Sequence, residues 1–300
     1  MIVLVSGASG LIGSRVVERL TDAGHTVARL VRSTGRLGEP VVHWNPETGA
    51  MNPSDLAGIH AVVHLAGDPI DRGRWTAKKK ASILNSRVNG TRLISTSIAS
   101  LERPPSTLIV ASASGYYGDR GDHMLTEESG PGNGFLAEVC RRWEEATEPA
   151  VQRGIRVVNL RTGLVLSTDG GLLAKLLTPF KLGVGGTLGD GRSYMSWVSL
   201  EDTIGAIEHA LNTVELTGPV NVSSPNPVTN GEFTRTLGKV LRRPTLMRVP
   251  ELVLKLALGR EKANDLALTS ARMLPAKLVA SGFAFAHSDL EPALRSALAR

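Results

Sequence analysis

Apolar residues at the start of the chain alternate between short continuous runs and helical stripes. Ile2 to Val5 is a β-branched run of the kind that forms a buried parallel strand. From Leu11 to about Ala23 the apolar residues recur at helical spacing, and Gly24 is a typical helix stop. His25 to Val31 then returns to a strand pattern. The order predicts a strand, turn, helix and strand as the first unit.

The same alternation continues through most of the chain. Further strands are predicted at Val41–Trp44 (a short edge strand), Ala61–Leu65, Thr107–Ala111, Ile155–Leu160 and Pro219–Val222. Helices are predicted at Trp75–Ala99 and Phe135–Gln152, and from Trp197–Asp202 to Leu211. Strands that alternate with helices indicate an α/β fold, here a Rossmann-type doubly wound parallel sheet.

Two regions break this rhythm. Residues 169–192 are rich in glycine, which favours an irregular lid or a small lobe that binds substrate. From Thr229 onwards the signals are helical and interrupted by prolines. We therefore expect a dinucleotide-binding domain in residues 1–168, to which 193–224 return. Residues 169–192 and 225–300 form the smaller, mostly helical substrate lobe.

Composition narrows the class of protein. A chain of 300 residues with 42% apolar residues can bury a large core, and no window reaches the roughly 18 apolar residues of a membrane span. The first residues lack a basic leader, and the single cysteine, Cys140, suits a reducing compartment, so we expect a cytoplasmic protein. The net charge of +6 is scattered and aromatic residues are few. We expect no nucleic-acid, membrane or metal partner, and a monomer or homodimer.

The turn after the first strand reads Gly7-Ala8-Ser9-Gly10-Leu11-Ile12-Gly13. Gly7 permits a tight turn, Gly10 allows a pyrophosphate to approach the backbone, and Gly13 lets the helix pack closely on the sheet. The helix N-terminus offers unpaired N–H groups to phosphates. This spacing predicts a dinucleotide site that also uses Ser9, Leu11 and Ile12; the alternative is a glycine turn without a ligand.

The end of the second strand indicates which cofactor is bound. NAD-specific sites place a carboxylate there, but this chain has Arg32 and Ser33 and no carboxylate before Glu39. The pattern therefore favours NADP(H), held at its 2′-phosphate by Arg32 and Ser33. The alternative is that Arg32 is only a solvated charge. The rest of the predicted cofactor site comprises Leu65, Ala66, Gly67, Arg87 and Leu164.

Candidate chemistry follows the strand that ends at Ala111. Hydroxyl groups at the carboxyl end of a central strand are suited to polarising a substrate carbonyl. Ser112, Tyr116 and Tyr117 are our catalytic candidates, although such a segment is often only a turn. The predicted substrate contacts are Lys175, Arg192 and Trp197.

These segments resemble a known family, the extended short-chain dehydrogenase/reductases of the NAD-dependent epimerase/dehydratase kind. More specifically, the chain is similar to an atypical branch, the YfcH-like epimerase family proteins, whose members carry a C-terminal domain of unknown function. The resemblance extends over nearly the whole chain and is carried by Gly7–Gly13, Arg74-Trp75, Asn89-Gly90-Thr91, Gly115–Gly118, Leu125–Glu127, Pro179–Gly183, Trp197–Asp202, Pro227–Asn230, Leu241–Pro244 and Leu274-Pro275. It implies an NADP(H)-binding fold with an uncharacterised substrate.

The sequence departs from that family at the catalytic positions. The resemblance implies a Ser, Tyr and Lys set, yet the helix beginning at Phe135 has no Tyr-x-x-x-Lys pair, and Ala113 occupies the serine position. Arg141 or Arg142 is the alternative source of the positive charge that the missing lysine would supply. Met195 occurs where nucleotide-sugar enzymes often have a diphosphate-binding arginine.

Three hypotheses follow. The first is an NADP(H)-dependent oxidoreductase acting on a small carbonyl or alcohol. The second is a nucleotide-sugar epimerase or dehydratase. The third, motivated by the missing Tyr and Lys, is an NADPH-binding sensor or regulatory protein with little catalysis.

Overall fold

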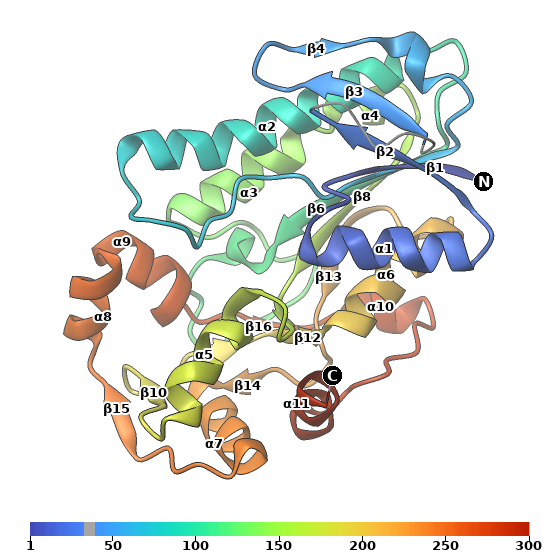
Figure 1. Cartoon of the computed structure of the whole chain (residues 1–300). Helices are drawn as coiled ribbons and strands as arrows, with labels where there is room; N and C mark the ends of the chain where they lie inside the picture. Colours follow the sequence, from blue (N-terminus) through green and yellow to red (C-terminus); the bar gives the residue numbers. More distant parts are fainter. Residues whose placement is uncertain (33–39, 300) are drawn as a thin grey trace.

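The computed structural model describes residues 1–32 and 40–299, and its central feature is an eight-stranded sheet (Figure 1). The strand order is β13-β8-β6-β5-β1-β2-β3-β4. These strands are β1 (Ile2–Ser6), β2 (Thr26–Val31), β3 (Val41–Asn45), β4 (Ala50–Met51), β5 (Ala61–His64), β6 (Thr107–Ala113), β8 (Arg156–Thr162) and β13 (Gly218–Val222). Neighbouring strands pair in parallel, apart from β3 with β4. The predicted doubly wound parallel sheet is confirmed.

The chain changes direction across the sheet between β1 and β5. It first builds outward through β2 and β3, then returns to add β5, β6 and β8 on the other side of β1. In open α/β sheets, ligands bind at the carboxyl ends of the strands at such a switch point. The ends of β1 and β5, where Ser6 pairs with His64, mark that point here.

Helices cover both faces of the sheet (Figure 1). Those on one face are α1 (Leu11–Asp22), α6 (Leu200–Asn212) and α10 (Ala276–Ala280), and those on the other are α2 (Ala77–Ala99), α3 (Phe135–Glu145) and α4 (Glu148–Gln152). Leu20, Ile207 and Leu278 belong to the core of the first face. Ile98 and Trp143 belong to the core of the second. The C-terminal α10 therefore completes a core that begins with β1.

One predicted helix is broken in the structure. The single helix expected over 135–152 is two helices, α3 and α4, separated at Ala146 and Thr147. Pro149 lies in the first turn of α4, and proline is tolerated only there because it lacks an N–H donor. The apolar stripe continues through the break, which is why periodicity alone did not reveal it.

The glycine-rich region, expected to be an irregular lid or a small lobe that binds substrate, contains a helix. The segment forms α5 (Gly171–Lys181) and β10 (Gly186–Leu188), and Leu173 and Phe180 are buried with Phe233 and Leu237.

The other elements are η1 (Pro53–Leu56), η2 (Ser114–Tyr117), β7 (Met124–Leu125), β9 (Leu164–Leu166), β11 (Tyr194–Met195), β12 (Trp197–Ser199), β14 (Val228–Thr229), α7 (Asn230–Leu241), β15 (Met247–Val249), α8 (Glu251–Leu258), α9 (Arg260–Ala263), the π-helical η3 (Asn264–Leu268), β16 (Arg272–Met273) and α11 (Leu290–Leu298). The C-terminal region is mostly helical, as predicted.

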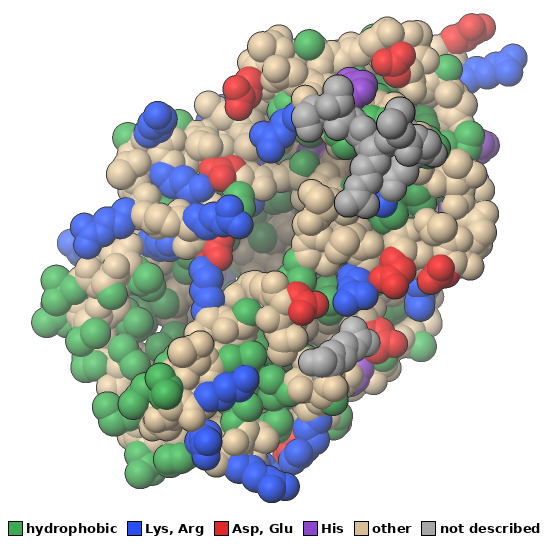
Figure 2. Space-filling model, in the orientation of Figure 1, with side chains coloured by type: hydrophobic (Ala, Val, Ile, Leu, Met, Phe, Trp, Pro, Cys, Tyr) green, Lys and Arg blue, Asp and Glu red, His purple; other side chains and the backbone are tan. Residues whose placement is uncertain are grey.

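No helix within the described ranges combines the length and apolar character needed to cross a membrane. The most exposed apolar side chains near the C-terminal helices are Leu246, on the way to β15, and Leu252 and Leu256 of α8. Figure 2 shows apolar atoms gathered over this part of the molecule, and a hollow in the middle of the same face.

Candidate functional site

The glycine turn is held by contacts that exclude side chains. Gly7 has φ +67°, and a Cβ atom there would lie 2.9 Å from the Ala66 nitrogen. A Cβ at Gly13 would lie only 2.1 Å from the Gly7 carbonyl oxygen. Both distances are far inside van der Waals contact, so the close approach of α1 to the end of β1 requires glycine at both positions.

Two buried polar residues fasten the ends of β1 and β5 beneath this turn. Ser6 Oγ is hydrogen-bonded to His64 Nδ1 at 2.6 Å, and it accepts the Leu65 and Ala66 amides at 3.1 and 3.3 Å. Burial and the nearby Arg87 charge lower the pKa of His64 to about 3, so its imidazole is neutral. This pair was not among the predicted site residues. The available signal was a polar residue closing each of two apolar strands.

Most of the predicted cofactor residues line one cavity. Its volume is about 310 Å³, and its walls include Gly7, Gly10, Leu11, Ile12, Gly13, Leu65 and Leu164. Ser9 lines a neighbouring hollow on the outer side of α1. Arg32 is exposed at the end of β2, whereas Ser33 lies outside the described residues. The structure thus brings together residues from β1, α1, β5 and β9 that are far apart in the sequence.

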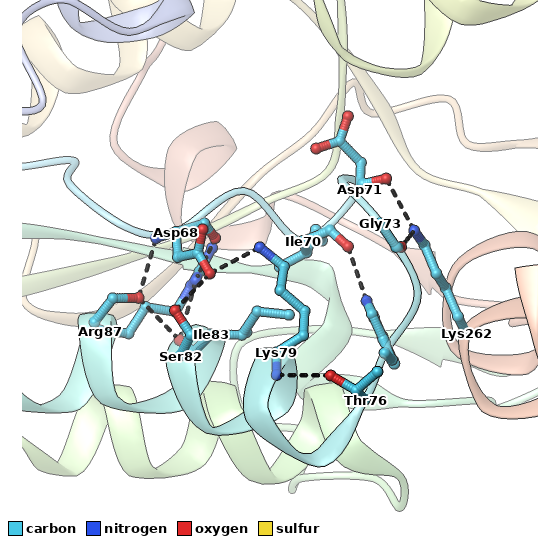
Figure 3. A network of polar contacts seen from close by, with 12 residues as sticks. Asp68, Ile70, Asp71, Gly73, Thr76, Lys79, Ser82, Ile83, Arg87 and Lys262 are labelled. Atoms are coloured by element: carbon cyan, nitrogen blue, oxygen red, sulfur yellow. Dashed lines mark hydrogen bonds and ion pairs between the residues drawn. The ribbon is translucent and has the colours of Figure 1, made fainter.

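Arg87 lies behind the loop that follows β5 (Figure 3). Its Nη1 donates to the carbonyls of Asp68 at 2.9 Å and Ile83 at 3.2 Å, and its guanidinium lies 5.0 Å from the Trp143 ring centroid. A Cβ at Gly67 would be 3.1 Å from Arg87 Cζ. Burial lowers the pKa of Arg87. The guanidinium is therefore packed against Gly67, where the sequence analysis expected a cofactor contact.

Charged residues fasten the loop between β5 and α2 to other parts of the molecule (Figure 3). The Asp68 carboxylate accepts from Lys79 and Ser82, both at 2.8 Å. Lys262, from α9, donates to the carbonyls of Asp71 at 2.9 Å and Gly73 at 2.8 Å. The loop is consequently tied both to α2 and to the C-terminal region.

A second cavity of about 270 Å³ continues from the first. Gly163, Leu164 and Leu172 line both cavities, so the two cavities adjoin, and together they are called the cleft below. The walls of the second cavity, called the pocket below, are mainly apolar: Ile70, Ala113, Leu136, Val139, Cys140, Trp143, Leu164, Leu172, Met195, Leu266 and Ala271. Its polar side chains are Arg87, Ser114, Thr162, Tyr194, Ser196, Asp265 and Thr269.

Two of the predicted catalytic residues have structural roles, so those predictions are wrong. Ser112 is buried, and its hydroxyl donates to Glu144 Oε1 at 2.7 Å. Tyr117 is fully buried; its hydroxyl donates to Asn221 Oδ1 at 2.7 Å, and burial raises its pKa. The third candidate, Tyr116, is half-buried and stacks on the guanidinium of Arg161, with 3.4 Å from Cζ to the ring centroid. It does not line the pocket.

The predicted substrate residues also lie outside the pocket. Trp197 is fully buried, and its indole N–H donates to the Asn226 carbonyl at 3.0 Å, so it is a core residue. Lys175 is exposed and forms an ion pair with Asp71 at 2.5 Å. Arg192 is exposed on the segment before β11. The prediction of a substrate contact is wrong for Trp197, and neither basic side chain is among the residues lining the pocket.

Two hydroxyl groups that the sequence analysis did not select face the pocket. Ser114 begins the turn η2, and Tyr194 belongs to β11. Both line the pocket, and neither hydroxyl has a hydrogen-bond partner among the described residues. Strand β6 ends at Ala113, so the backbone turns between Ser112 and Ser114 and directs them to different surroundings. No local pattern marked Tyr194, which reaches the pocket through the pairing of β11 with β14.

Helix α3 presents no Tyr and Lys to the pocket. Leu136 and Cys140, four residues apart, line it instead. Burial raises the pKa of Cys140 to about 12, so the sulfur remains a neutral thiol. Within the described residues no group of three His, Cys, Asp or Glu side chains is arranged to hold a metal ion.

Comparison with known proteins identifies the family. A profile described as "NAD dependent epimerase/dehydratase family" matches residues 3–223, and one described as "Domain of unknown function (DUF1731)" matches 249–297. The chain is 43% identical over 299 residues to an epimerase family protein of Mycobacterium bovis, covering 100% of this chain and 98% of that protein. It is 38% identical over 303 residues to epimerase family protein YfhF of Bacillus subtilis, with coverage of 100% and 98%.

A solved structure agrees with these relatives. The human epimerase family protein SDR39U1, crystallised with NADPH, superposes with a TM-score of 0.89 at 29% identity, covering 99% of this chain and 98% of that one. The resemblance stated from the sequence is confirmed. The chain belongs to the NAD dependent epimerase/dehydratase family and carries that family's C-terminal domain of unknown function.

Proposed function

We propose that the protein is an NADP(H)-dependent oxidoreductase that acts on a small, largely apolar carbonyl or alcohol. The observation that carries this proposal is the single cleft in which the glycine-turn cavity continues into the pocket through Gly163, Leu164 and Leu172. A dinucleotide with its pyrophosphate at the glycine turn would extend towards the pocket, and bound NADPH supplies a hydride there.

Arg32 supports NADP(H) over NAD(H). The side chain is exposed at the end of β2, next to the part of the cleft where the adenosine ribose binds in this fold. A guanidinium there pairs with a 2′-phosphate, which a carboxylate would repel. NADPH in the structure of the human relative supports the same choice.

The pocket favours a small substrate over a nucleotide sugar. At about 270 Å³ it lies below the roughly 300–1,000 Å³ range of sites for drug-sized ligands. Met195 lines it at the position where an arginine would bind a diphosphate. Apolar walls with a few protic groups suit a small ketone, aldehyde or secondary alcohol.

A second candidate is an NADPH-binding protein with little turnover. The observation that favours it is the absence of the family's Ser, Tyr and Lys set from the pocket, where Ala113 of β6 and Leu136 and Cys140 of α3 are lining residues. The two candidates share the cofactor site and differ only in whether a bound carbonyl is reduced.

Calorimetry and kinetics test the proposal in two stages. We expect NADPH to bind more tightly than NADH, and Arg32→Ala to weaken NADPH binding by about tenfold, or about 1.4 kcal/mol, while NADH binding changes little. The exposed Arg103→Ala is the matched control and should bind both cofactors as the wild type does. Loss of nicotinamide absorbance is then followed with a panel of small ketones, aldehydes and o-quinones. Tight NADPH binding without oxidation by any acceptor would favour the second candidate, and equal affinity for both cofactors would contradict the choice of NADP(H).

A further inference from the structure

Asp265 belongs to the C-terminal region but lies at the start of α3. Its Oδ2 accepts the backbone N–H of Leu136 at 3.2 Å. A Cβ at Gly134, where φ is +108°, would lie 3.3 Å from both carboxylate oxygens. The residue is presented by the π-helical turn η3, a conformation that is rare and often occurs at functional sites. A long-range contact thus delivers a carboxyl group to the helix that lacks the family's Tyr and Lys.

The same side chain borders two adjoining cavities. Asp265 lines the pocket, and it also lines a more polar cavity of about 410 Å³ with Asp119, Asn133, Glu251 and Asn264. Among the described residues lining the pocket it is the one carboxylate. A group at this boundary can meet a substrate on one side and exchange protons with solvent on the other.

The surroundings of Asp265 favour a carboxyl that holds its proton to higher pH. Partial burial, and then the negative charge of Glu261, raise the pKa of Asp265, while the N–H groups of Leu136 and Phe135 and the charge of Lys80 oppose that rise. Lys80 is itself paired with Glu261 at 2.6 Å, so the effects of these two charges on Asp265 partly offset each other, and burial is the main cause of the rise. The net direction is upward, as in other carboxyl groups that act as general acids.

We propose that Asp265 is the proton-exchanging residue of the pocket, giving its proton to the substrate oxygen during reduction and taking one back during oxidation. This inference rests on the proposed oxidoreductase function. In reduction, the carbonyl carbon gains the hydride that NADPH supplies, and the C=O π pair moves onto oxygen. The Asp265 O–H bond breaks as the new alcohol O–H bond forms. The carboxylate then regains a proton from water in the polar cavity, so one carbonyl, one NADPH and one proton give one alcohol and one NADP⁺.

Ser114 and Tyr194 are the other two residues that we assign to the substrate oxygen. Their hydroxyls line the same pocket and have no partner among the described residues, so they are available to bind the substrate oxygen. Tyr194 is the rival proton donor, because its phenol is the other acidic O–H group among the described residues that line the pocket. The experiment therefore has to separate the phenol from the carboxyl.

The test compares Asp265→Asn with Tyr194→Phe and with the control Asp119→Asn, whose side chain lines only the polar cavity. Asparagine retains an oxygen that can accept the Leu136 N–H, so Asp265→Asn should fold and bind NADPH like the wild type. Reduction of the carbonyl panel is measured from pH 4 to 9, and the Leu136 amide is followed by NMR over the same range in protein without cofactor.

We expect Asp265→Asn to reduce turnover by at least about 100-fold and to abolish its pH dependence, because general acid catalysis contributes about 10²–10⁴-fold. Tyr194→Phe should lower turnover while keeping the pH profile, and Asp119→Asn should change neither. The wild-type Leu136 amide should titrate at a pH above the ordinary aspartate range, and this transition should disappear in Asp265→Asn.

Four results would overturn the inference. One is an Asp265→Asn variant with wild-type turnover and pH profile, which would leave the oxidoreductase proposal intact. Another is loss of the pH dependence in Tyr194→Phe alone, which would assign the proton to the phenol. A Leu136 amide that titrates within the ordinary aspartate range also contradicts it. Absence of turnover by the wild type with every acceptor removes both proposals together.

Discussion

The two ends of the cleft are built in different ways. The glycine-turn end is centred on one short segment, in which Gly7 and Gly13 let the backbones of β1 and α1 approach each other and the residues after β5 closely. The pocket end is assembled from β6, α3, β11 and η3, and side-chain contacts such as that of Asp265 with the Leu136 amide connect these distant segments. Backbone contacts within one segment leave a readable sequence motif, whereas side-chain contacts between distant segments do not.

The largest expected effect concerns the side-chain network beside the pocket. Glu144 receives Arg161 Nε at 2.9 Å and Nη2 at 2.8 Å, and it accepts the Ser112 hydroxyl. Glu144→Gln leaves the buried Arg161 charge without its counter-charge, and we expect the free energy of unfolding to fall by about 3–5 kcal/mol. Urea denaturation measures it. Glu145→Gln, which removes one exposed partner of Arg141, is the control and should be near neutral. If Glu144→Gln and Glu145→Gln both lowered the free energy of unfolding by an equal, small amount, this network would not stabilise the pocket wall.

The glycine-turn end should be sensitive to a single methyl group. Alanine normally stabilises a helix by about 1 kcal/mol relative to glycine, but at position 13 its Cβ would lie 2.1 Å from the Gly7 oxygen. We expect Gly13→Ala to destabilise the fold by about 2 kcal/mol and to abolish measurable NADPH binding by calorimetry. Gly24→Ala, where nothing lies within 4 Å but φ is +78°, should cost only about 1 kcal/mol and keep NADPH binding. A Gly13→Ala variant that binds NADPH normally would show that close packing here is dispensable.

A substitution of Lys262 tests whether the C-terminal region restrains the loop between β5 and α2. Its side chain is 6% exposed, and Lys262→Met removes both hydrogen bonds to the Asp71 and Gly73 carbonyls. We expect a loss of about 1.5–2 kcal/mol in stability and faster amide hydrogen exchange in residues 70–75. Lys255→Met, which breaks only an ion pair within α8, should change stability by less than about 0.5 kcal/mol. Unchanged exchange in the loop would show that Lys262 does not restrain it.

The last effect is confined to acidic pH and comes from the buried pair beneath the glycine turn. His64 has a pKa of about 3 when folded, against 6.5 when unfolded, so the unfolded chain binds the extra proton between those values. The contribution of His64 to stability is therefore complete above pH 6.5 and decreases by up to about 1.4 kcal/mol per pH unit as the pH falls towards 3. Urea denaturation at a series of pH values measures the slope, which should diminish in His64→Gln and persist in His43→Gln, an exposed control. The prediction fails if the two variants have the same slope.

The sequence predicted the sheet and the glycine-turn cavity because both depend on local spacing. The strand runs and the glycine motif were sufficient to bring residues such as Gly10 and Leu65 to one cavity. The sequence did not predict which serine hydroxyl faces the pocket. Ser112, near the end of β6, is buried, whereas Ser114, two residues later, lines the pocket. Nor did it reveal Tyr194 and Asp265, whose positions depend on contacts of β11 with β14 and of η3 with α3.

The C-terminal region packs into the core that the first strands begin, and this affects how the protein folds while it is being synthesised. Leu278 is fully buried in the core between the sheet, α1 and α6, and Phe283 and Phe285 pack against it. A nascent chain that has produced only the eight strands still exposes this apolar face, which chaperones can bind. Because the closing residues follow β13 along the chain, this part of the core is complete only after residues 276–285 have been translated.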